Sequence, residues 1–197
     1  MKKKRSVIND AAYRLFSNYG YKRVTMDDVA KEAGVTKKTV YDYYKNKNDL
    51  LLQLILNELQ IMKQIITDIE QEQLSYFKTI HRTIYELLKY KKKQQLLVVL
   101  GDEVKRTNRE ELRHIIYTFD LSIKTYIHDK LSQAVAEGNI KPCNVDVMAF
   151  LVYKMYVSLL FEWDLEKEPI DEKELSDNLI HILTTGLFSE REDENNE

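Results

Sequence analysis

Apolar residues recur at intervals of three and four along most of the chain, which is the spacing of side chains on one face of an α-helix. The first such stretch predicts a helix from about Ser6 to Tyr19. Its inward stripe consists of Ile8, Ala11, Ala12, Leu15, Phe16 and Tyr19. A longer stripe after Asn46, a good N-cap residue, predicts a helix that ends at about Asp68 or Glu70. Later helices are expected at about 73–90, 92–105, 109–137, 144–165 and 171–188. The pattern predicts an all-α fold.

Residues that interrupt helices are rare, since the 197-residue chain has five glycines and two prolines. Long helices with short connections are therefore expected. The predicted breaks are Lys91, Thr107 with Asn108, the segment from Gly138 to Pro142, and Pro169. From Ser189 onward the chain is acidic and lacks apolar periodicity, which predicts a disordered tail at 189–197.

Two short helices are predicted ahead of Asn46, and they meet at a glycine. Thr25 is expected to cap the first, with Asp28 answering from three residues on. Gly34 follows the last inward position of that helix and can adopt the left-handed conformation that ends it. Thr36 then caps the second helix. The inward residues are Val29, Ala30 and Ala33 in the first helix, and Val40 and Tyr44 in the second. Two capped helices around a tight turn indicate a helix-turn-helix.

The charge is distributed unevenly along the chain. Residues 1–48 carry twelve Lys or Arg and five Asp or Glu, a net charge of +7. Because the whole chain has a formal charge of −2, residues 49–197 carry −9. A basic segment joined to an acidic remainder is typical of a nucleic-acid-binding domain attached to a domain with another task. A solvated helix–loop–helix with a few lysines would not explain this asymmetry.

Candidate DNA contacts lie on the outward face of the second helix and at helix N-termini, where phosphate is favoured. The predicted contact residues are Thr25, Thr36, Lys37, Lys38, Thr39, Tyr41, Tyr43 and Lys47. Of these, Thr25 and Lys47 are assigned to phosphates. Lys38 and Thr39 are expected to influence the preferred base sequence.

Three motifs follow one another between Ala11 and Leu51. They read Phe16-x-x-x-Gly20-Tyr21-x-x-x-Thr25, Asp28-Val-Ala-x-x-Ala-Gly34-Val-Thr36 and Thr39-Val40-Tyr41-x-Tyr-Tyr44-Lys-x-Lys47-x-Asp-Leu50-Leu51. This run resembles the N-terminal domain of the TetR family of transcriptional regulators. Where many members have glycine before the position of Thr39, this chain has Lys38, which makes the surface nearest the bases bulkier and more cationic.

The resemblance implies a three-helix DNA-binding domain at 1–48 and a larger helical domain at 49–188 for effector binding and dimerisation. The expected function is that of a repressor, bound to double-stranded operator DNA as a homodimer and released by a small-molecule effector. Effector binding would tilt the helix after Asn46 and change the separation of the two recognition helices.

A subunit interface is predicted from the segment between Val147 and Trp163. It is apolar on nearly all sides and interrupted by Lys154, Ser158 and Glu162. A membrane span is not expected from this length with those charges. Burial of such a helix in a small domain favours contact with a second copy, together with the last helix, over an intramolecular core alone.

The effector pocket is expected between the helices at 109–137 and 144–165, where aromatic residues are frequent. Tyr117, Tyr156 and Trp163 are the candidate lining residues. Aromatic walls favour an apolar or aromatic effector. Its acidic group, where present, could be oriented by Lys124, Lys154 or His128.

Two other classes of function are weaker alternatives. A helical-bundle metalloenzyme would use Glu-x-x-His steps, and Glu111 with His114 forms one such step without a second. A non-regulatory DNA-binding module would not require the long C-terminal part. No catalytic residue, metal or cofactor is therefore expected. The single cysteine, Cys143, and an N-terminus without an apolar signal predict a cytoplasmic protein.

Overall fold

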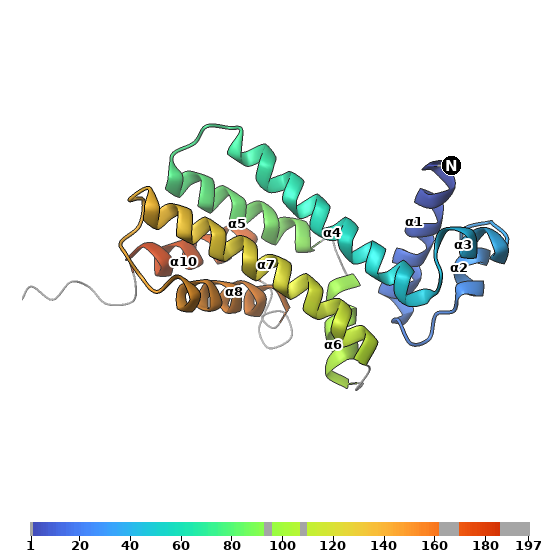
Figure 1. Cartoon of the computed structure of the whole chain (residues 1–197). Coiled ribbons are helices and arrows are strands. Elements are labelled where there is room, and N and C mark those ends of the chain that lie inside the picture. Colours follow the sequence, from blue (N-terminus) through green and yellow to red (C-terminus); the bar gives the residue numbers. More distant parts are fainter. Residues whose placement is uncertain (1, 93–95, 107–109, 162–169, 186–197) are drawn as a thin grey trace, which may run out of the picture.

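The computed structural model describes residues 2–92, 96–106, 110–161 and 170–185, and within them the protein is all-α. The helices are α1 (Lys2–Tyr19), α2 (Met26–Glu32), α3 (Lys37–Tyr43), α4 (Lys47–Glu70), α5 (Tyr76–Lys92), α6 (Leu96–Arg106), α7 (Glu110–Ala136), α8 (Val145–Phe161) and α10 (Glu172–Thr185). Helices α1, α2 and α3 form a head at one end of an elongated molecule (Figure 1). Helix α4 runs from the head into a body that contains α5, α7, α8 and α10, and α6 contacts both α1 and α7.

The predicted helices are confirmed within the described residues, with boundaries moved by a few positions. Helix α1 begins at Lys2 rather than at Ser6, because lysine is a good helix former and extends the helix beyond its apolar stripe. The expectation that Tyr19 faces inward is wrong, since this last residue of α1 is 59% exposed. The predicted ends of the last two helices, and the tail from Ser189, lie outside the described residues.

The head and the body share one continuous hydrophobic core. In the head, Phe16 and Val40 are fully buried, and they belong to the same cluster as Leu50 and Leu51 from the first turns of α4. The cluster extends into the body through Leu54, Ile55, Met62 and Ile66 of α4, Leu88 of α5, Leu100 of α6, Phe119 of α7 and Tyr156 of α8. Because apolar burial is the dominant stabilising term, α4 connects the two parts energetically as well as covalently.

The start of helix α4 is defined by a side-chain cap. The Asn46 side chain caps it, with Oδ1 accepting from the Asp49 amide at 2.9 Å. The Asp49 carboxylate in turn accepts from the Lys45 amide at 3.0 Å. These bonds satisfy donors that a helix start leaves unpaired, and they fix the direction in which α4 leaves the head.

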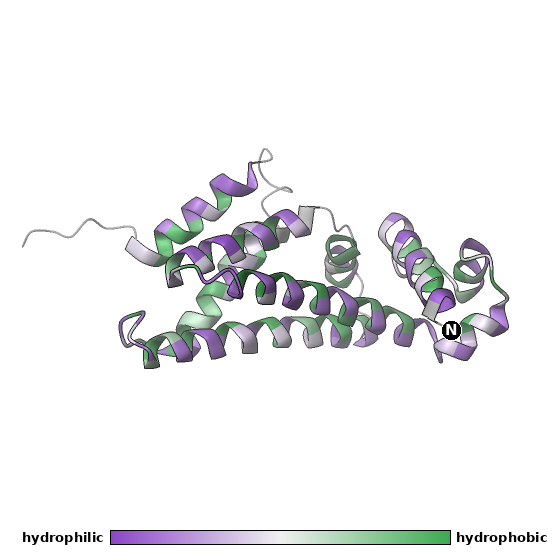
Figure 2. Cartoon of the chain, turned by 90° about the horizontal axis from the view of Figure 1, so that it is seen from above, coloured by the Kyte–Doolittle hydropathy of each residue, from purple (hydrophilic) through white to green (hydrophobic). Residues whose placement is uncertain are grey.

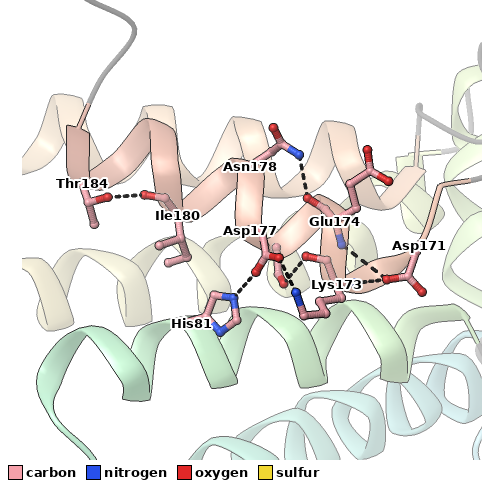
Figure 3. Close-up of polar contacts among 9 residues, drawn as sticks. His81, Asp171, Lys173, Glu174, Asp177, Asn178, Ile180 and Thr184 are labelled. Carbon is pink, nitrogen blue, oxygen red and sulfur yellow. Dashed lines mark hydrogen bonds and ion pairs between the residues drawn. The ribbon is translucent and has the colours of Figure 1, made fainter. Parts of the chain in front are cut away.

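Hydrophobic and hydrophilic residues are interspersed along the helices of the body (Figure 2), as expected of amphipathic helices in a bundle. A polar cluster also connects α10 with α5 (Figure 3). His81 Nε2 of α5 lies 2.6 Å from Asp177 Oδ1 of α10, and Lys173 Nζ donates to Asp177 Oδ2 at 2.7 Å. Hydrogen bonds from Lys173 and His81 lower the pKa of the Asp177 carboxyl. Of these contacts, the one between His81 and Asp177 joins α10 to α5.

A buried carboxyl group lies where the head meets the body. Glu58 of α4 is only 5% exposed and accepts a hydrogen bond from the Tyr90 hydroxyl of α5 at 2.8 Å. Burial raises the pKa of Glu58, although the bond from Tyr90 opposes this shift. Burial, followed by the Glu58 charge, also raises the pKa of Tyr13 in α1. Glu58 therefore influences all three helices at the junction.

Glu58→Gln tests the cost of this buried carboxyl group. In the unfolded chain the group ionises near its ordinary value of 4.5, whereas in the folded protein the pKa is raised. The unfolded state therefore releases its proton first, and the contribution of Glu58 to the stability of the wild type falls as the pH rises above about 4.5. Urea unfolding should show that the free energy of unfolding of the variant increases relative to that of the wild type between pH 5 and pH 8. Glu72→Gln, at an exposed position, is the control; a difference between Glu58→Gln and wild type that is constant with pH would contradict the expectation.

Candidate nucleic-acid interface

Helix α2 begins with the predicted capping box. Thr25 Oγ1 accepts from the Asp28 amide at 3.2 Å, and Asp28 Oδ2 accepts from the Thr25 amide at 2.8 Å. The Thr25 hydroxyl also donates to Asp28 Oδ2 at 2.6 Å. These hydrogen bonds lower the pKa of the Asp28 carboxyl. Thr25 is exposed. Because its hydroxyl already caps α2, a contact with a DNA phosphate would have to form beside these capping hydrogen bonds.

The turn between α2 and α3 follows the Schellman pattern. Gly34 has φ of +64°, its amide donates to Lys31 O at 3.2 Å, and the Val35 amide donates to Ala30 O at 3.0 Å. A Cβ at position 34 would meet no atom within 4 Å, so the backbone conformation alone favours glycine here. Thr36 then caps α3 by accepting from the Thr39 amide at 3.2 Å. The predicted helix-turn-helix is confirmed in its caps and its turn.

Helix α3 has one buried and one exposed face, as the pattern predicts. Val40 is fully buried, and Tyr44, which follows the last residue of the helix, is 2% exposed. On the other face Lys37, Lys38 and Tyr41 are exposed. Thr39 is half-buried between the two faces. The outer face of α3 therefore presents two ammonium groups, a phenol and a threonine, which together can contact phosphates and base edges.

Tyr43 differs from the other predicted contact residues of α3. Its side chain packs against the hydrophobic core, and its ring centroid lies 6.5 Å from that of Tyr44. It is half-buried rather than fully outward. A contact between Tyr43 and DNA stays a prediction, and it would involve only the exposed part of the side chain.

Lys37 forms an ion pair across the motif. Its Nζ lies 2.8 Å from Oδ1 and 3.0 Å from Oδ2 of Asp27 in α2. The hydrogen bond and charge of Asp27 raise the pKa of Lys37. Both groups are exposed, so the pair adds little stability, and a DNA phosphate could replace the carboxylate as the partner of Lys37.

Lys47 has an intramolecular role that the sequence does not reveal. Its Nζ donates to Tyr21 O at 2.7 Å and to Val24 O at 2.8 Å, and it lies 4.2 Å from the ring centroid of Tyr21. The ammonium group therefore holds the loop between α1 and α2. Its assignment to a DNA phosphate stays a prediction, and any such contact would compete with these carbonyl groups.

The head carries further cations that could contact DNA, although the helical spacing of residues in the sequence does not identify them as candidates. Arg5 of α1 donates to the Tyr44 hydroxyl at 3.2 Å and to Gln53 Oε1 of α4 at 2.8 Å. Lys22 and Arg23, in the loop before α2, are exposed. Their signal in the sequence is the charge excess of residues 1–48, which does not show which cations share a face with α3.

The predicted effector residues occupy different environments. Tyr156 of α8 is 6% exposed, and its hydroxyl has no hydrogen-bond partner within the described part of the chain. Burial raises its pKa. Tyr117 of α7 is 58% exposed, which does not support a place in an enclosed pocket, and Trp163 lies outside the described residues. The structure therefore brings only Tyr156 into the core between α7 and α8.

The three side chains considered for an acidic effector, Lys124, Lys154 and His128, lie near the surface. Lys124 Nζ is 4.7 Å from the ring centroid of Tyr153, and His128 Nε2 is 3.5 Å from Asp146 Oδ1. A surface groove of about 320 Å³ is lined by Lys124, Thr125, His128, Asp146, Ala149 and Phe150. Lys154 is exposed on α8. None of the three side chains is shown to reach the buried hydroxyl of Tyr156.

Two other structural features bear on the alternative functions. Glu111 and His114 are both exposed on α7, and no group of three potential metal-ligating side chains occurs among the residues that the structure describes. None of the described helices is both long and apolar enough to cross a bilayer.

Comparisons with known proteins cover both the head and the body. A family model described as bacterial regulatory proteins, tetR family, matches residues 8–54. The HTH-type transcriptional regulator YhgD of Bacillus subtilis is 31% identical over 184 residues, which are 93% of this chain and 96% of that protein. The fatty acid metabolism regulator protein of Bacillus subtilis is 24% identical over 92% of this chain and 94% of its own length.

Solved structures share the fold over nearly the whole chain. FadR from Bacillus subtilis, in complex with stearoyl-CoA, matches with a TM-score of 0.79 and 23% identity over 93% of this chain and 99% of that chain. Thermus thermophilus FadR, a TetR family repressor in complex with lauroyl-CoA, matches with a TM-score of 0.68 and 18% identity over 98% and 100% of the two chains. At these identities the likeness shows the fold alone.

The different surroundings of Lys38 and Lys47 predict different effects of their replacement by alanine. Lys38→Ala should weaken DNA binding and change the preferred sequence, with stability altered by at most about 0.5 kcal/mol, because the side chain is exposed. Lys47→Ala should lower stability by about 1.5–3 kcal/mol, because it removes charge-assisted bonds to two carbonyl groups.

Urea unfolding and binding measured over a range of salt concentrations separate the two roles. If Lys47 also neutralises a phosphate, the salt slope of Lys47→Ala should fall by about one. Unchanged stability in Lys47→Ala would contradict the carbonyl contacts, and unchanged sequence preference in Lys38→Ala would remove that residue from base recognition.

Proposed function

The chain belongs to the TetR family of transcriptional regulators, and on this basis we propose that it is a dimeric repressor whose operator binding is relieved by a small-molecule effector. The observation that carries the proposal is the outer face of α3, where Lys37, Lys38 and Tyr41 are exposed on a helix fixed by two caps. A helix of this kind can enter the major groove, while neighbouring cations contact phosphates.

Dimerisation is supported by the outer face of α8. Val147 is 51% exposed, Phe150 is 53% exposed and Leu151 is 46% exposed, although the opposite face is buried against α7. Ile182 on α10 is 40% exposed. Three apolar residues together on one helix face are costly in water, and a second copy that covers α8 and α10 would remove this cost.

A dimer would also set the distance between the α3 helices of its two copies. Two copies of α3 would enter successive major grooves if they lay about 34–36 Å apart on one face of the duplex. In each chain the head lies at one end of the molecule, at the start of α4 (Figure 1). An interface built from α8 and α10 of both copies would bring the two bodies together and leave the two heads apart. A change in the direction of α4 would therefore alter the separation of the heads.

The effector site is proposed in the body core next to Tyr156. A buried hydroxyl without a partner costs about 1–3 kcal/mol, and a ligand that accepts its hydrogen bond would recover this. Met62 and Ile66 of α4 belong to the same apolar cluster. A ligand that displaced part of this cluster would act directly on α4, and a difference in affinity of a few kcal/mol between the two conformations is enough to empty an operator.

We propose an acyl thioester of coenzyme A as the chemical class of the effector. The hydrophobic cluster that contains Tyr156 would suit an aliphatic chain that displaced part of it, and a thioester carbonyl could accept from the Tyr156 hydroxyl. Support comes from the relatives as well, since two FadR structures of the same fold contain stearoyl-CoA or lauroyl-CoA. These two compounds are therefore the probes of choice.

The dimeric repressor is tested by selection of bound duplexes from a random pool, followed by footprinting. The selected operator should contain two half-sites in inverted repeat, and the wild-type protein should sediment as a dimer.

Leu151→Glu should give monomers, because it would bury an unpaired charge at the interface, and should weaken operator binding by about a hundredfold. Leu74→Glu, at an exposed apolar residue between α4 and α5, is the matched control. A wild-type monomer at micromolar concentration would rule out the dimer. Leu159 is less suitable, since it packs against the core of its own subunit.

The effector site is tested by Tyr156→Phe, which removes the unpartnered hydroxyl and keeps the ring. The variant should be slightly more stable than the wild type, and release of the operator should require about tenfold more stearoyl-CoA if the hydroxyl binds the ligand. Tyr117→Phe, at an exposed tyrosine, provides the control and also tests whether that residue contacts the effector. Unchanged release in Tyr156→Phe would exclude a ligand contact at this hydroxyl.

A further inference from the structure

The loop between α1 and α2 is bound by a side chain from α6, about eighty positions further along the chain. Glu103 Oε2 accepts from the Tyr21 amide at 2.7 Å, and Glu103 Oε1 accepts from the Lys22 amide at 2.7 Å. Both carboxylate oxygens are therefore used on consecutive backbone N–H groups. Hydrogen bonds from amides to an ionised carboxylate are short and about twice as strong as neutral ones.

The loop is shaped to admit this carboxylate. Gly20 has φ of +79°, a conformation that side chains rarely adopt. A Cβ at this position would lie 3.1 Å from Glu103 Oε2, which is tighter than almost all such contacts. The backbone conformation therefore favours glycine at position 20, and a side chain there would also displace the Glu103 carboxylate by a few tenths of an ångström.

The same loop is held from its other side by α4. Lys47 Nζ donates to the carbonyl groups of Tyr21 and Val24, while Glu103 accepts from the amides of Tyr21 and Lys22. The Tyr21 hydroxyl also donates a hydrogen bond to Asn48 Oδ1 of α4. An anion from α6 and a cation from α4 thus fix one short loop, and the next residue after Val24 is the N-cap of α2.

Helix α6 is suited to transmit a change in the body. It contacts α1 of the head and α7 of the body, and Leu96, Leu97 and Leu100 place it in the shared core. A displacement of α6 must either carry the loop along or break two charge-assisted bonds. Beside its apolar packing in the shared core, α6 therefore makes a directional polar contact with the loop that precedes α2.

We propose that Glu103 is a positioning residue for operator binding: its carboxylate locks the α1–α2 loop to the body and so fixes the angle at which each head presents α3. The assignment rests on the proposed function as a dimeric DNA-binding regulator. Its consequence is selectivity for the spacing of the two half-sites. With the carboxylate bonds in place each subunit is rigid, and without them the heads can adjust to operators of other lengths.

The test compares full-length Glu103→Gln with wild type. Glutamine has one oxygen acceptor, and its NH₂ group would face a second amide N–H, so at least one bond is lost. Hydrogen exchange should become about tenfold faster at the amides of Tyr21 and Lys22. The affinity ratio between the selected operator and the same operator lengthened by two base pairs should fall at least about fivefold. Asp102→Asn is the matched control, because that carboxylate bonds Arg106 of its own helix at 3.2 Å.

The outcomes separate the positioning role from a structural role and from the proposed function. The proposal is supported if Glu103→Gln shows faster amide exchange at Tyr21 and Lys22 and a lower affinity ratio between the selected and the lengthened operator (the spacing ratio), and if Asp102→Asn shows neither change. An unchanged spacing ratio overturns it, because loss of stability alone lowers both affinities equally. If Glu103→Gln does not fold, Glu103→Asp keeps the charge, withdraws the oxygens by one methylene and should reduce the ratio in the same way. A wild-type protein that selects no duplex refutes the proposed function, while unchanged exchange at Tyr21 and Lys22 independently refutes the role of the carboxylate.

Discussion

The head and the body are coupled, because a single hydrophobic core continues along α4 from one to the other. Leu50 and Leu51 complete the core of the helix-turn-helix, and Met62 and Ile66 lie in the cluster that contains Tyr156. Separating the two parts would expose both sets to water, which the hydrophobic effect opposes. The proposed regulation depends on this constraint, since a rearrangement in the body would act on α3 through the shared core.

Local chemistry accounts for the parts of the structure that the sequence predicts well. Thr25, Gly34, Thr36 and Asn46 each act on backbone groups within a few positions, so their roles follow from the order of residues alone. The inward faces of α2 and α3 follow from helical spacing in the same way. Family membership then adds the arrangement of the body, which composition and periodicity leave open.

Contacts between distant segments account for the rest. The sequence offers Lys47 as a cation at a helix start, and only the fold places the carbonyl groups of Tyr21 and Val24 around it. Glu103 carries no signal at all, since its partners are backbone amides. Glu58 could have been suspected, because it occupies an inward position of α4. The exposure of Tyr117 could not, because apolar residues occur on several sides of α7 and leave its orientation undetermined.

The close approach of Gly20 and Glu103 also limits how such a regulator can evolve. Substitutions around Tyr156 would leave this contact untouched, whereas any change in α6 that removes the acceptor at position 103 would leave the same two amides without their partner. A homologue with a side chain at position 20 would need a shorter or displaced residue at position 103, so the two positions should covary. We therefore expect changes of ligand specificity to leave this pair intact, because it attaches the head to the body at a distance in sequence from Tyr156.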